Sequence, residues 1–329
     1  VTTTPTYAPA THPRPERTKA VEVGMNAKFL SNKIWLDATY YDTNTYNQLF
    51  LYDAPPSTGY KQSYLNAGKV NNWGVEAVAG YKNTWTGFSW STAFNFSLNR
   101  NKIRELVPEG TIDPVTGAEV SLPEVNMDFG GYRVKLRKGG SIGDFYVTGL
   151  KTDDQGQIYV DPNSGSVSID PDTWIYAGNT DARYRMGWNN QFSWKGISLG
   201  VLVDARIGGR GVSVTQALMD RFGVSQASAD AREAGGVRIS EKQPILGVKD
   251  FYANTGDGMG MLSQYVYSMT NVRLRELTLG YDLPSSWFND KLRATVSLIG
   301  RNLFMFYNKA PFDPEVTPST STYYQNLDF

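Results

Sequence analysis

The chain has 329 residues, and its 32 lysines and arginines are balanced by 32 aspartates and glutamates. This balance disfavours a nucleic-acid-binding protein, because phosphate binding needs a basic excess. There is no cysteine and a single histidine, His12, which excludes thiol catalysis, disulfide scaffolds and nearly all histidine or cysteine metal sites. No run approaches about eighteen apolar residues, so the sequence predicts no transmembrane helix.

Four segments with alternating apolar and polar residues occupy the first part of the chain. Residues 21–29 place apolar side chains at odd positions, and a break at Ser31-Asn32 precedes a second segment at 34–40. A third segment covers 73–81 and a fourth covers 88–98, with a turn between them near residue 84. Alternation with a period of two predicts half-buried β-strands.

The longest alternation lies at 183–207, where two runs meet at Lys195-Gly196. Each run lasts about ten residues or more, whereas strands in soluble proteins usually last about five or six. A strand that crosses a bilayer needs roughly 9 to 11 residues with one apolar face. The pattern therefore predicts a membrane-crossing hairpin, with Val203 facing lipid and Asp204 facing the lumen.

Two more strands are predicted at 271–283 and 292–302, and the alanine-rich stretch 214–234 favours a short helix within a loop. Short turns, near 31, 84, 195 and 287, alternate with long loops, which we expect near 43–66, 99–182, 208–270 and 303–329. Outer-membrane barrels combine short periplasmic turns with long extracellular loops in this way. The chain is therefore predicted to be all-β, a transmembrane antiparallel β-barrel segment of about eight strands in a Gram-negative outer membrane.

Short motifs support a closer interpretation of this barrel segment. They are PER at 15–17, EVG at 22–24, FLSNKI at 29–34, YY at 40–41, NWGVE at 72–76, FNFSLN at 94–99, GSIGDFY at 140–146, GNTD at 178–181, VRLRELTLGYDLP at 272–284, GRNLF at 300–304 and FDPE at 312–315. In this order they resemble the C-terminal barrel half of SusC/RagA-type TonB-dependent transporters of Bacteroidetes. Ala182 stands where that family commonly has a proline.

The resemblance implies a larger protein around this chain. Residues 1–329 would be the C-terminal part of one 22-stranded TonB-dependent receptor barrel, whose plug and remaining strands lie outside the chain. The family imports oligosaccharides or peptides, is driven through TonB, and works with a SusD-like surface lipoprotein that lids the extracellular mouth. The resemblance thus implies TonB, the plug, the remaining barrel, outer-membrane lipid and a glycan or peptide ligand as partners. Two alternatives remain open, an outer-membrane adhesion barrel without active uptake and a soluble β-rich lectin.

Charged residues inside the amphipathic strands are the candidate site residues. They are Glu76, Asp204, Arg206, Arg273, Arg275 and Arg301. An arginine at mid-depth on a lipid-facing surface costs about 2–4 kcal/mol, so we expect these side chains to face the lumen or the rim. There they could contact the plug or the substrate, or could form a hydrated wall. Four loop aromatics could stack on sugars or pack within the loops, namely Trp174, Tyr176, Tyr323 and Tyr324.

The sequence gives no sign of catalysis or of a cofactor. No spacing of carboxylates indicates the acid and base pair of a glycosidase, so we expect no enzyme activity. Oxygen-rich stretches at 153–156 and 161–163 could ligate calcium. They lack the spaced acidic positions and the terminal glutamate of a calcium-binding loop, so we expect turns there and keep loop calcium as the lesser alternative.

Overall fold

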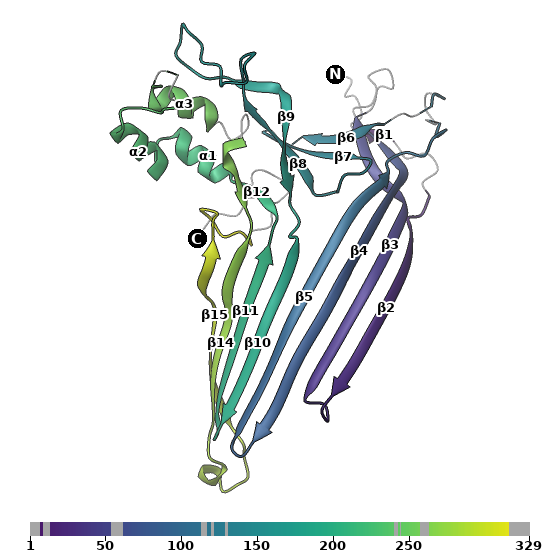
Figure 1. Ribbon diagram of the computed structural model, residues 1–329, viewed down its shortest axis with the longest axis vertical. Coiled ribbons are helices and arrows are strands. Elements are labelled where there is room, and N and C mark those ends of the chain that lie inside the picture. The colour runs from purple at the N-terminus through teal and green to yellow at the C-terminus, as the bar shows by residue number, and fades with distance from the viewer. Residues whose placement is uncertain are drawn as a thin grey trace, which may run out of the picture.

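One antiparallel sheet of eight long strands dominates the computed structural model (Figure 1). The structure describes residues 7–8, 14–53, 62–112, 117–119, 122–128, 131–239, 243, 245–256 and 263–315. The strands, given in their hydrogen-bonded order, are β2 (Arg17–Phe29), β3 (Ile34–Asp53), β4 (Gln62–Trp85), β5 (Phe88–Glu105), β10 (Tyr184–Trp194), β11 (Ile197–Ile207), β14 (Asn271–Asp282) and β15 (Thr295–Asn308). A short strand, β1 (Tyr7–Ala8), pairs in parallel with β4. The expected all-β class and the eight predicted strands are confirmed.

Short turns join the strands at one end of the sheet, which we call the turn end. The β10–β11 hairpin pairs without interruption from Tyr184 opposite Ile207 to Trp194 opposite Ile197. Its two-residue turn has φ angles of 47° at Lys195 and 86° at Gly196. Two successive left-handed residues match the twist of the strands that they join, which explains why this hairpin keeps a strict register.

Three of the four predicted turns are short, but the last is longer than expected. Residues 283–294 separate β14 from β15 and contain a 3₁₀ turn at Ser285–Phe288, followed by left-handed Asn289 and Asp290. The predicted strand at 292–302 therefore begins at Thr295 instead. The apolar residues before it extend the alternation in the sequence, but their backbone belongs to the turn.

Several strands extend farther than predicted at the opposite end, which we call the loop end. The segment 43–66 was expected to be a loop, yet β3 continues to Asp53 and β4 begins at Gln62. Likewise β5 continues to Glu105 and β15 to Asn308, past the expected loop starts at 99 and 303. Outside a membrane a strand needs no lipid-facing apolar side, so pairing can continue where apolar alternation has stopped.

The long connections at the loop end hold folded elements. Residues 99–182 contain a four-stranded sheet of β6 (Glu124–Asp128), β7 (Tyr132–Arg137), β8 (Asp144–Leu150) and β9 (Ile169–Asn179). Residues 208–270 contain the hairpin of β12 (Arg210–Val212) with β13 (Val266–Ser268), and the helices α1 (Val214–Arg221), α2 (Gln226–Glu233) and α3 (Val248–Thr255). The single helix expected at 214–234 is two helices, because left-handed Gly223 interrupts it. Among the described residues, no helix has the length and apolar character needed to cross a membrane.

These elements lie above the large sheet (Figure 1), and small apolar cores hold them there. One core contains Val70, Ile103, Leu106, Val125 and Leu136, so it joins β4 and β5 to the β6–β7 hairpin. A second contains Phe145, Val147, Val212, Ala217 and Tyr265, so it joins β8 to β12 and α1. The loops therefore pack on one another and on the strand ends as a second layer.

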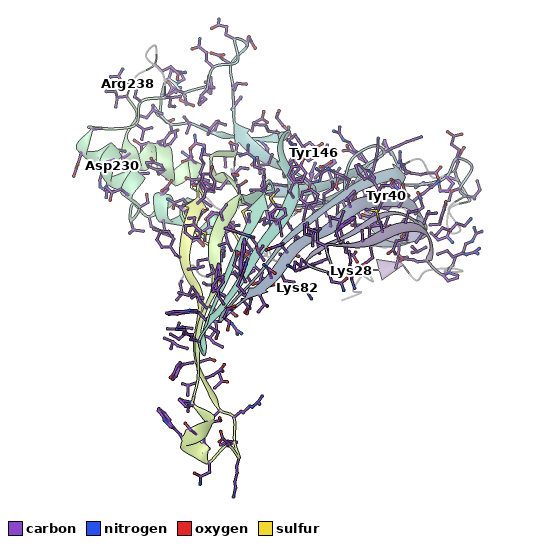
Figure 2. All side chains as sticks on the ribbon, turned by 60° about the horizontal axis from the view of Figure 1, so that its bottom comes forward. Lys28, Tyr40, Lys82, Tyr146, Asp230 and Arg238 are labelled. Carbon is purple, nitrogen blue, oxygen red and sulfur yellow. The ribbon has the colours of Figure 1, made fainter. Side chains whose placement is uncertain are left out.

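The large sheet has an apolar face and a polar face, and side chains project from both (Figure 2). Val203 lies opposite Trp188 on the apolar face, and the Trp188 side chain is 51% exposed. Its neighbour Asp204 lies on the polar face opposite Gly187. Exposed apolar side chains are stable on a lipid-facing surface. The predicted orientation of the central hairpin is thus confirmed as two opposite faces.

Two polar side chains on the apolar face accept hydrogen bonds from tryptophans. Buried Asn190 accepts a hydrogen bond from Nε1 of Trp90 at 3.3 Å, and Thr92 accepts one from Nε1 of Trp188 at 3.0 Å. An unpaired amide or hydroxyl in hydrocarbon would be costly. The indole donors remove that cost while presenting their apolar rings outward.

We predict that residues 1–329 refolded alone will not form a closed barrel. The described part of β2 pairs only with β3, and that of β15 pairs only with β14, so both leave a hydrogen-bonding edge open. Open strand edges are intolerable in lipid and aggregate in water. Refolding into detergent should give no heat-modifiable monomer on gel electrophoresis, whereas the complete polypeptide should give one. A protease-resistant, heat-modifiable monomer from residues 1–329 would contradict this prediction.

We also predict that Val203→Arg destabilises the complete barrel by about 2–4 kcal/mol, because it places a charge on the apolar face. Leu202→Arg is the matched control, since Leu202 lies on the polar face opposite Glu276. Urea unfolding in detergent micelles would compare the two variants. Equal losses of stability would contradict the assignment of the faces, and a larger loss for Leu202→Arg would reverse it.

Candidate functional site

Charged side chains gather on the polar face near the loop end of β11 and β14. Arg273 is buried and donates two hydrogen bonds to the Asp313 carboxylate, at 2.7 and 3.2 Å. Arg275 donates to Asp204 at 2.6 and 2.9 Å and also pairs with Glu315, which lies 3.2 Å from Arg273. We call these five residues the arginine–carboxylate cluster. It fastens the segment that follows β15 against the wall of the sheet.

A β-bulge places both arginines of the cluster on the polar face. Arg273 lies opposite Asp204, whereas Leu277 lies opposite Val201 on the apolar face, although 273 and 277 are both odd positions. The pairing shifts between Leu274 and Glu276, so Arg275 is the extra residue. A bulge sets two residues of one strand against one residue of its partner and redirects the side chains beyond it.

A second irregularity, in β15, completes this environment. Asn302 is left-handed, with φ of 52°, and its side-chain oxygen accepts a hydrogen bond from Arg275 at 2.9 Å. Beside it, Arg301 pairs with Glu276 at 3.0 Å. The Arg301 side chain is 73% exposed, so this pair contributes at most about 1 kcal/mol. The structure thus brings together Asp204, Arg273 and Arg275, and sets Arg301 next to them in a separate pair.

The partners of the cluster could not be assigned from the sequence. The FDPE motif at 312–315 was one of the motifs that resemble the transporter family, but its carboxylates lie about forty positions from the arginines that they neutralise. Nothing in strand alternation reports such a contact. The available signal was charge, because two arginines in an amphipathic strand favour carboxylate partners and FDPE supplies two.

A hollow of about 210 Å³ opens on the polar face and is lined from β3, β4, β5 and the start of β10. Its wall includes Glu76, Arg185, Asp181 and Tyr41. The Tyr41 ring lies over Gly74, where a Cβ atom would come within 2.4 Å of the tyrosine hydroxyl oxygen. The absent side chain at residue 74 therefore makes room for the ring, and Tyr41 donates a hydrogen bond to Asn99 at 3.2 Å.

Arg206 lies near this hollow and forms no ion pair with the residues that the structure describes. It stands directly opposite Arg185 in the β10–β11 pairing, and like charges in that arrangement are destabilising. Arg206 donates to the Thr180 carbonyl at 3.0 Å, but its Nε is buried and has no hydrogen-bond partner. Glu76 and Arg206 thus belong to the hollow region of the lumen wall, separate from the arginine–carboxylate cluster.

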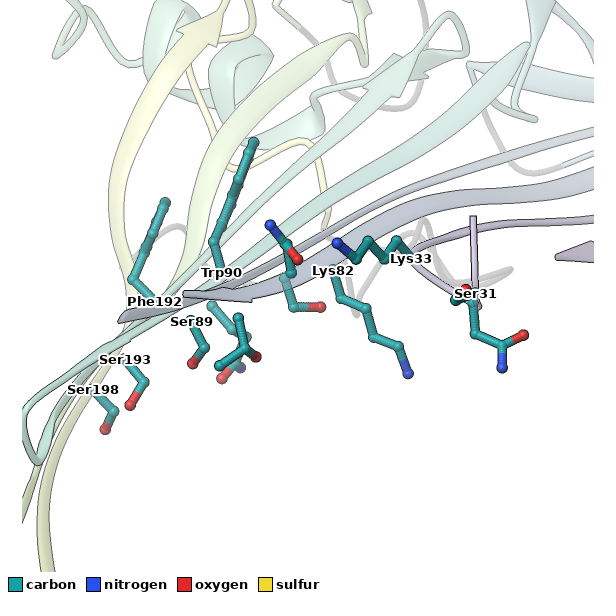
Figure 3. A pocket seen from close by; sticks show the side chains of 13 residues that line it. Ser31, Lys33, Lys82, Ser89, Trp90, Phe192, Ser193 and Ser198 are labelled. Atoms are coloured by element: carbon teal, nitrogen blue, oxygen red, sulfur yellow. The ribbon is translucent and has the colours of Figure 1, made fainter. Parts of the chain in front are cut away.

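A larger polar hollow of about 560 Å³ lies at the turn end (Figure 3). Lys82, Ser89, Ser193 and Ser198 project from one side of the sheet there, and Trp90 projects from the other. The residues that line it are Ser31, Asn32, Lys33, Lys82, Asn83, Thr84, Ser89, Trp90, Ser91, Gln191, Phe192, Ser193 and Ser198. The polar face is therefore hydrophilic at both ends of the strands, as a water-filled lumen requires.

Two of the four candidate loop aromatics are engaged by neighbouring side chains. The Arg133 guanidinium lies 4.1 Å from the centre of the Trp174 ring. Tyr176 donates a hydrogen bond to Asp144 at 3.2 Å, and burial followed by the charge of Asp144 raises the pKa of Tyr176. Both rings belong to β9 in the loop layer, and Tyr176 is 54% exposed. Tyr323 and Tyr324 lie outside the described residues.

Two of the motifs that resemble the transporter family meet in this layer. Asp144, from GSIGDFY, accepts a hydrogen bond from the Asn179 amide of GNTD at 3.0 Å. The Thr180 amide then donates to the Gly143 carbonyl at 3.0 Å. Ala182, which stands at the proline position, is buried where the chain enters β10. The two motifs thus form one joint between the loop layer and the central hairpin.

The oxygen-rich stretches form turns. Asp153 accepts backbone hydrogen bonds from Gln155 and Gln157, and Asp161 accepts them from Asn163 and Ser164. These bonds lower the pKa of Asp161. No group of three or more histidine, cysteine, aspartate or glutamate side chains suited to a metal occurs in the described part of the chain. Loop calcium stays an untested prediction.

We predict that acid releases the 309–315 segment. The Arg273 guanidinium holds the pKa of Asp313 below its ordinary value, which is about 3.9. Because the folded-state pKa is depressed, the ion pair contributes its full stability above pH 4 and loses it as the pH falls through the lowered pKa. Pepsin cleavage of this segment should therefore accelerate below about pH 3.9. Asp313→Asn should already be cleaved fast at pH 4, and identical pH profiles for the two proteins would contradict the prediction.

Comparisons with known proteins agree with this geometry. The family model described as "TonB dependent receptor-like, beta-barrel" matches residues 3–210. TonB-dependent receptor P3 of Formosa agariphila is 28% identical over 316 residues, covering 91% of this chain and 30% of that protein. TonB-dependent receptor SusC of Bacteroides thetaiotaomicron is 23% identical over 314 residues, covering 92% of this chain and 30% of SusC.

Solved structures with a similar fold include the RagAB peptide transporter. It has a TM-score of 0.64 at 19% identity, and the match covers 93% of this chain and 34% of that one. The RagAB peptide importer in its "open-open" state has a TM-score of 0.67 at 19% identity, covering 91% of this chain and 32% of that one. The chain thus spans about a third of the length of these relatives.

Proposed function

Because this chain belongs to the TonB-dependent receptor-like β-barrel family, we propose that it forms part of the wall of a TonB-driven importer in the outer membrane. The observation that carries the proposal is the separation of the two faces. The apolar face exposes large apolar side chains, while the polar face holds the arginine–carboxylate cluster and both hollows. A sheet of this kind separates lipid from an aqueous lumen.

We propose oligosaccharides or peptides as the cargo. The hollow beside Tyr41 offers a carboxylate at Glu76, a guanidinium at Arg185 and an amide at Asn99, all of which can hydrogen-bond to sugar hydroxyls or to peptide groups. The name of the RagAB peptide transporter supports the peptide class. None of the named relatives is described as an enzyme, and the polar groups here serve as binding contacts.

We further propose that a SusD-like lipoprotein covers the loop end. The loop layer carries exposed apolar side chains on the helices and their connection, including Phe222 at 73% and Val224 at 69% exposure. Exposed apolar groups beyond the membrane favour a protein partner. The plug and the connection to TonB would come from the rest of the polypeptide.

Uptake should depend on TonB while surface binding does not. A barrel of about 22 strands encloses a lumen wide enough to need a plug, and the outer membrane has no nucleotide pool or ion gradient to drive import. Deleting the TonB-binding segment of the complete receptor should therefore abolish accumulation of labelled ligand and leave binding to whole cells intact. Uptake at its full rate without TonB would instead identify a diffusive porin. Intact binding in a receptor that never imports would identify an adhesion barrel.

A further inference from the structure

A group of cations lies at the loop end of the apolar face. Its members, which we call the basic band, are Arg17, Lys19, Lys69, Arg100, Lys102 and Arg104. They come from β2, β4 and β5, and β3 lies between β2 and β4 in the sheet. Charges are unexpected on this face, because a few residues farther along the same strands it would meet hydrocarbon.

Strand pairing fixes the position of the band. Lys19 lies opposite Asn44, two positions beyond Val21, which is 65% exposed on the apolar face. Arg100 lies opposite Trp73, two positions beyond Leu98. Two residues of strand span roughly 7 Å, so the cations lie just past the edge of the apolar surface. This is the depth at which lipid headgroups meet a barrel.

No ion pair neutralises the band among the residues that the structure describes. Lys19 and Lys69 approach the same ring, Tyr46, at 5.7 and 5.0 Å from its centre. Arg100 lies 5.5 Å from the centre of the Tyr184 ring and donates to the Arg183 carbonyl. Aromatic faces and carbonyls attract cations but do not cancel their charge.

Few carboxylates share the face with the band. In the described side chains of β2 to β5, Asp42 and Glu105 are the acidic residues on it. Asp42 already accepts hydrogen bonds from the amides of Asn44 and Asn71, at 3.0 and 2.8 Å. Six cations against two carboxylates leave a local excess of positive charge, although the whole chain is neutral. Such an excess calls for anions from outside the chain.

We propose that the basic band binds the phosphoryl groups of phosphorylated glycolipids in the outer leaflet of the outer membrane. Guanidinium and ammonium groups are strong donors to phosphate, and long basic side chains reach from apolar surface to the headgroup level. The continuity of the band with the lipid-facing residues of the same strands favours a lipid over a protein partner. The proposal rests on the outer-membrane location given under the proposed function.

The test uses the complete receptor, purified in detergent, with and without charge removal in the band. The variant combines Lys19→Gln, Lys69→Gln and Lys102→Gln, which keeps side-chain length and polarity. The matched control combines Lys28→Gln, Lys33→Gln and Lys82→Gln, which removes the same charge at the turn end, where Lys28 and Lys82 lie (Figure 2). The probe is bisphosphorylated lipid A, and dephosphorylated lipid A serves as the reference lipid.

Native mass spectrometry would count the lipids retained. We expect the band variant to retain at least five-fold less bisphosphorylated lipid A than the wild type, and the control to stay within two-fold. Dephosphorylated lipid A should bind all three proteins weakly and equally. Equal retention of bisphosphorylated lipid by the band variant and the wild type would overturn the proposal, as would strong binding of the dephosphorylated lipid.

Two further measurements distinguish failure of the lipid-binding proposal from failure of the proposed import function. If the triple variant does not fold, Lys102→Gln alone and a salt titration of the wild type replace it, and retention that does not change with salt would also overturn the proposal. Ligand uptake by the same wild-type receptor tests the importer independently. Lipid binding without TonB-dependent uptake would support the lipid-binding proposal and reject the importer. Uptake without lipid binding would reject only the lipid-binding proposal.

Discussion

Every charged side chain within the strands must lie on the polar face or at the rim, and the other features of the structure depend on this constraint. Strict alternation alone would point Arg273 and Arg275 to the same side as Leu277 and Leu279. The bulge at Arg275 resolves the conflict by reversing the faces between them. The left-handed backbone at Asn302 accommodates the change in the neighbouring strand. The arginine–carboxylate cluster then uses both arginines to hold the chain that follows β15.

The strands and their faces could be predicted from the sequence because both follow from local alternation. The central hairpin is the clearest case, since Val203 and Asp204 are neighbours of opposite character and the structure places them on opposite faces. The ends of the strands could not be predicted. Beyond residue 40, β3 continues to Asp53 by pairing with β4, although apolar and polar residues no longer alternate there.

The candidate site was predictable in its members but not in its partnerships. The cost of charge in lipid directs attention to Asp204, Arg273 and Arg275, whereas contacts across about forty or seventy positions determine which carboxylate neutralises which arginine. Arg206 differs from these three residues in its surroundings. We expected it to face the lumen for the same reason, yet the register sets it opposite Arg185, and it forms no ion pair with the described residues. The wall thus has one region held by direct ion pairs and another in which Arg185 and Arg206 lie opposite each other.

The bulge at Arg275 also matters for how mutational data on this protein and its relatives would be read. On the turn-end side of Arg275, odd positions of β14 share the apolar face, and on the loop-end side they share the polar face. A scan with a membrane-impermeant thiol reagent along β14 would therefore reverse its phase at one residue, within an unbroken strand. An alignment that assumed uniform alternation would exchange lumen and lipid positions from that point on, and its errors would be systematic.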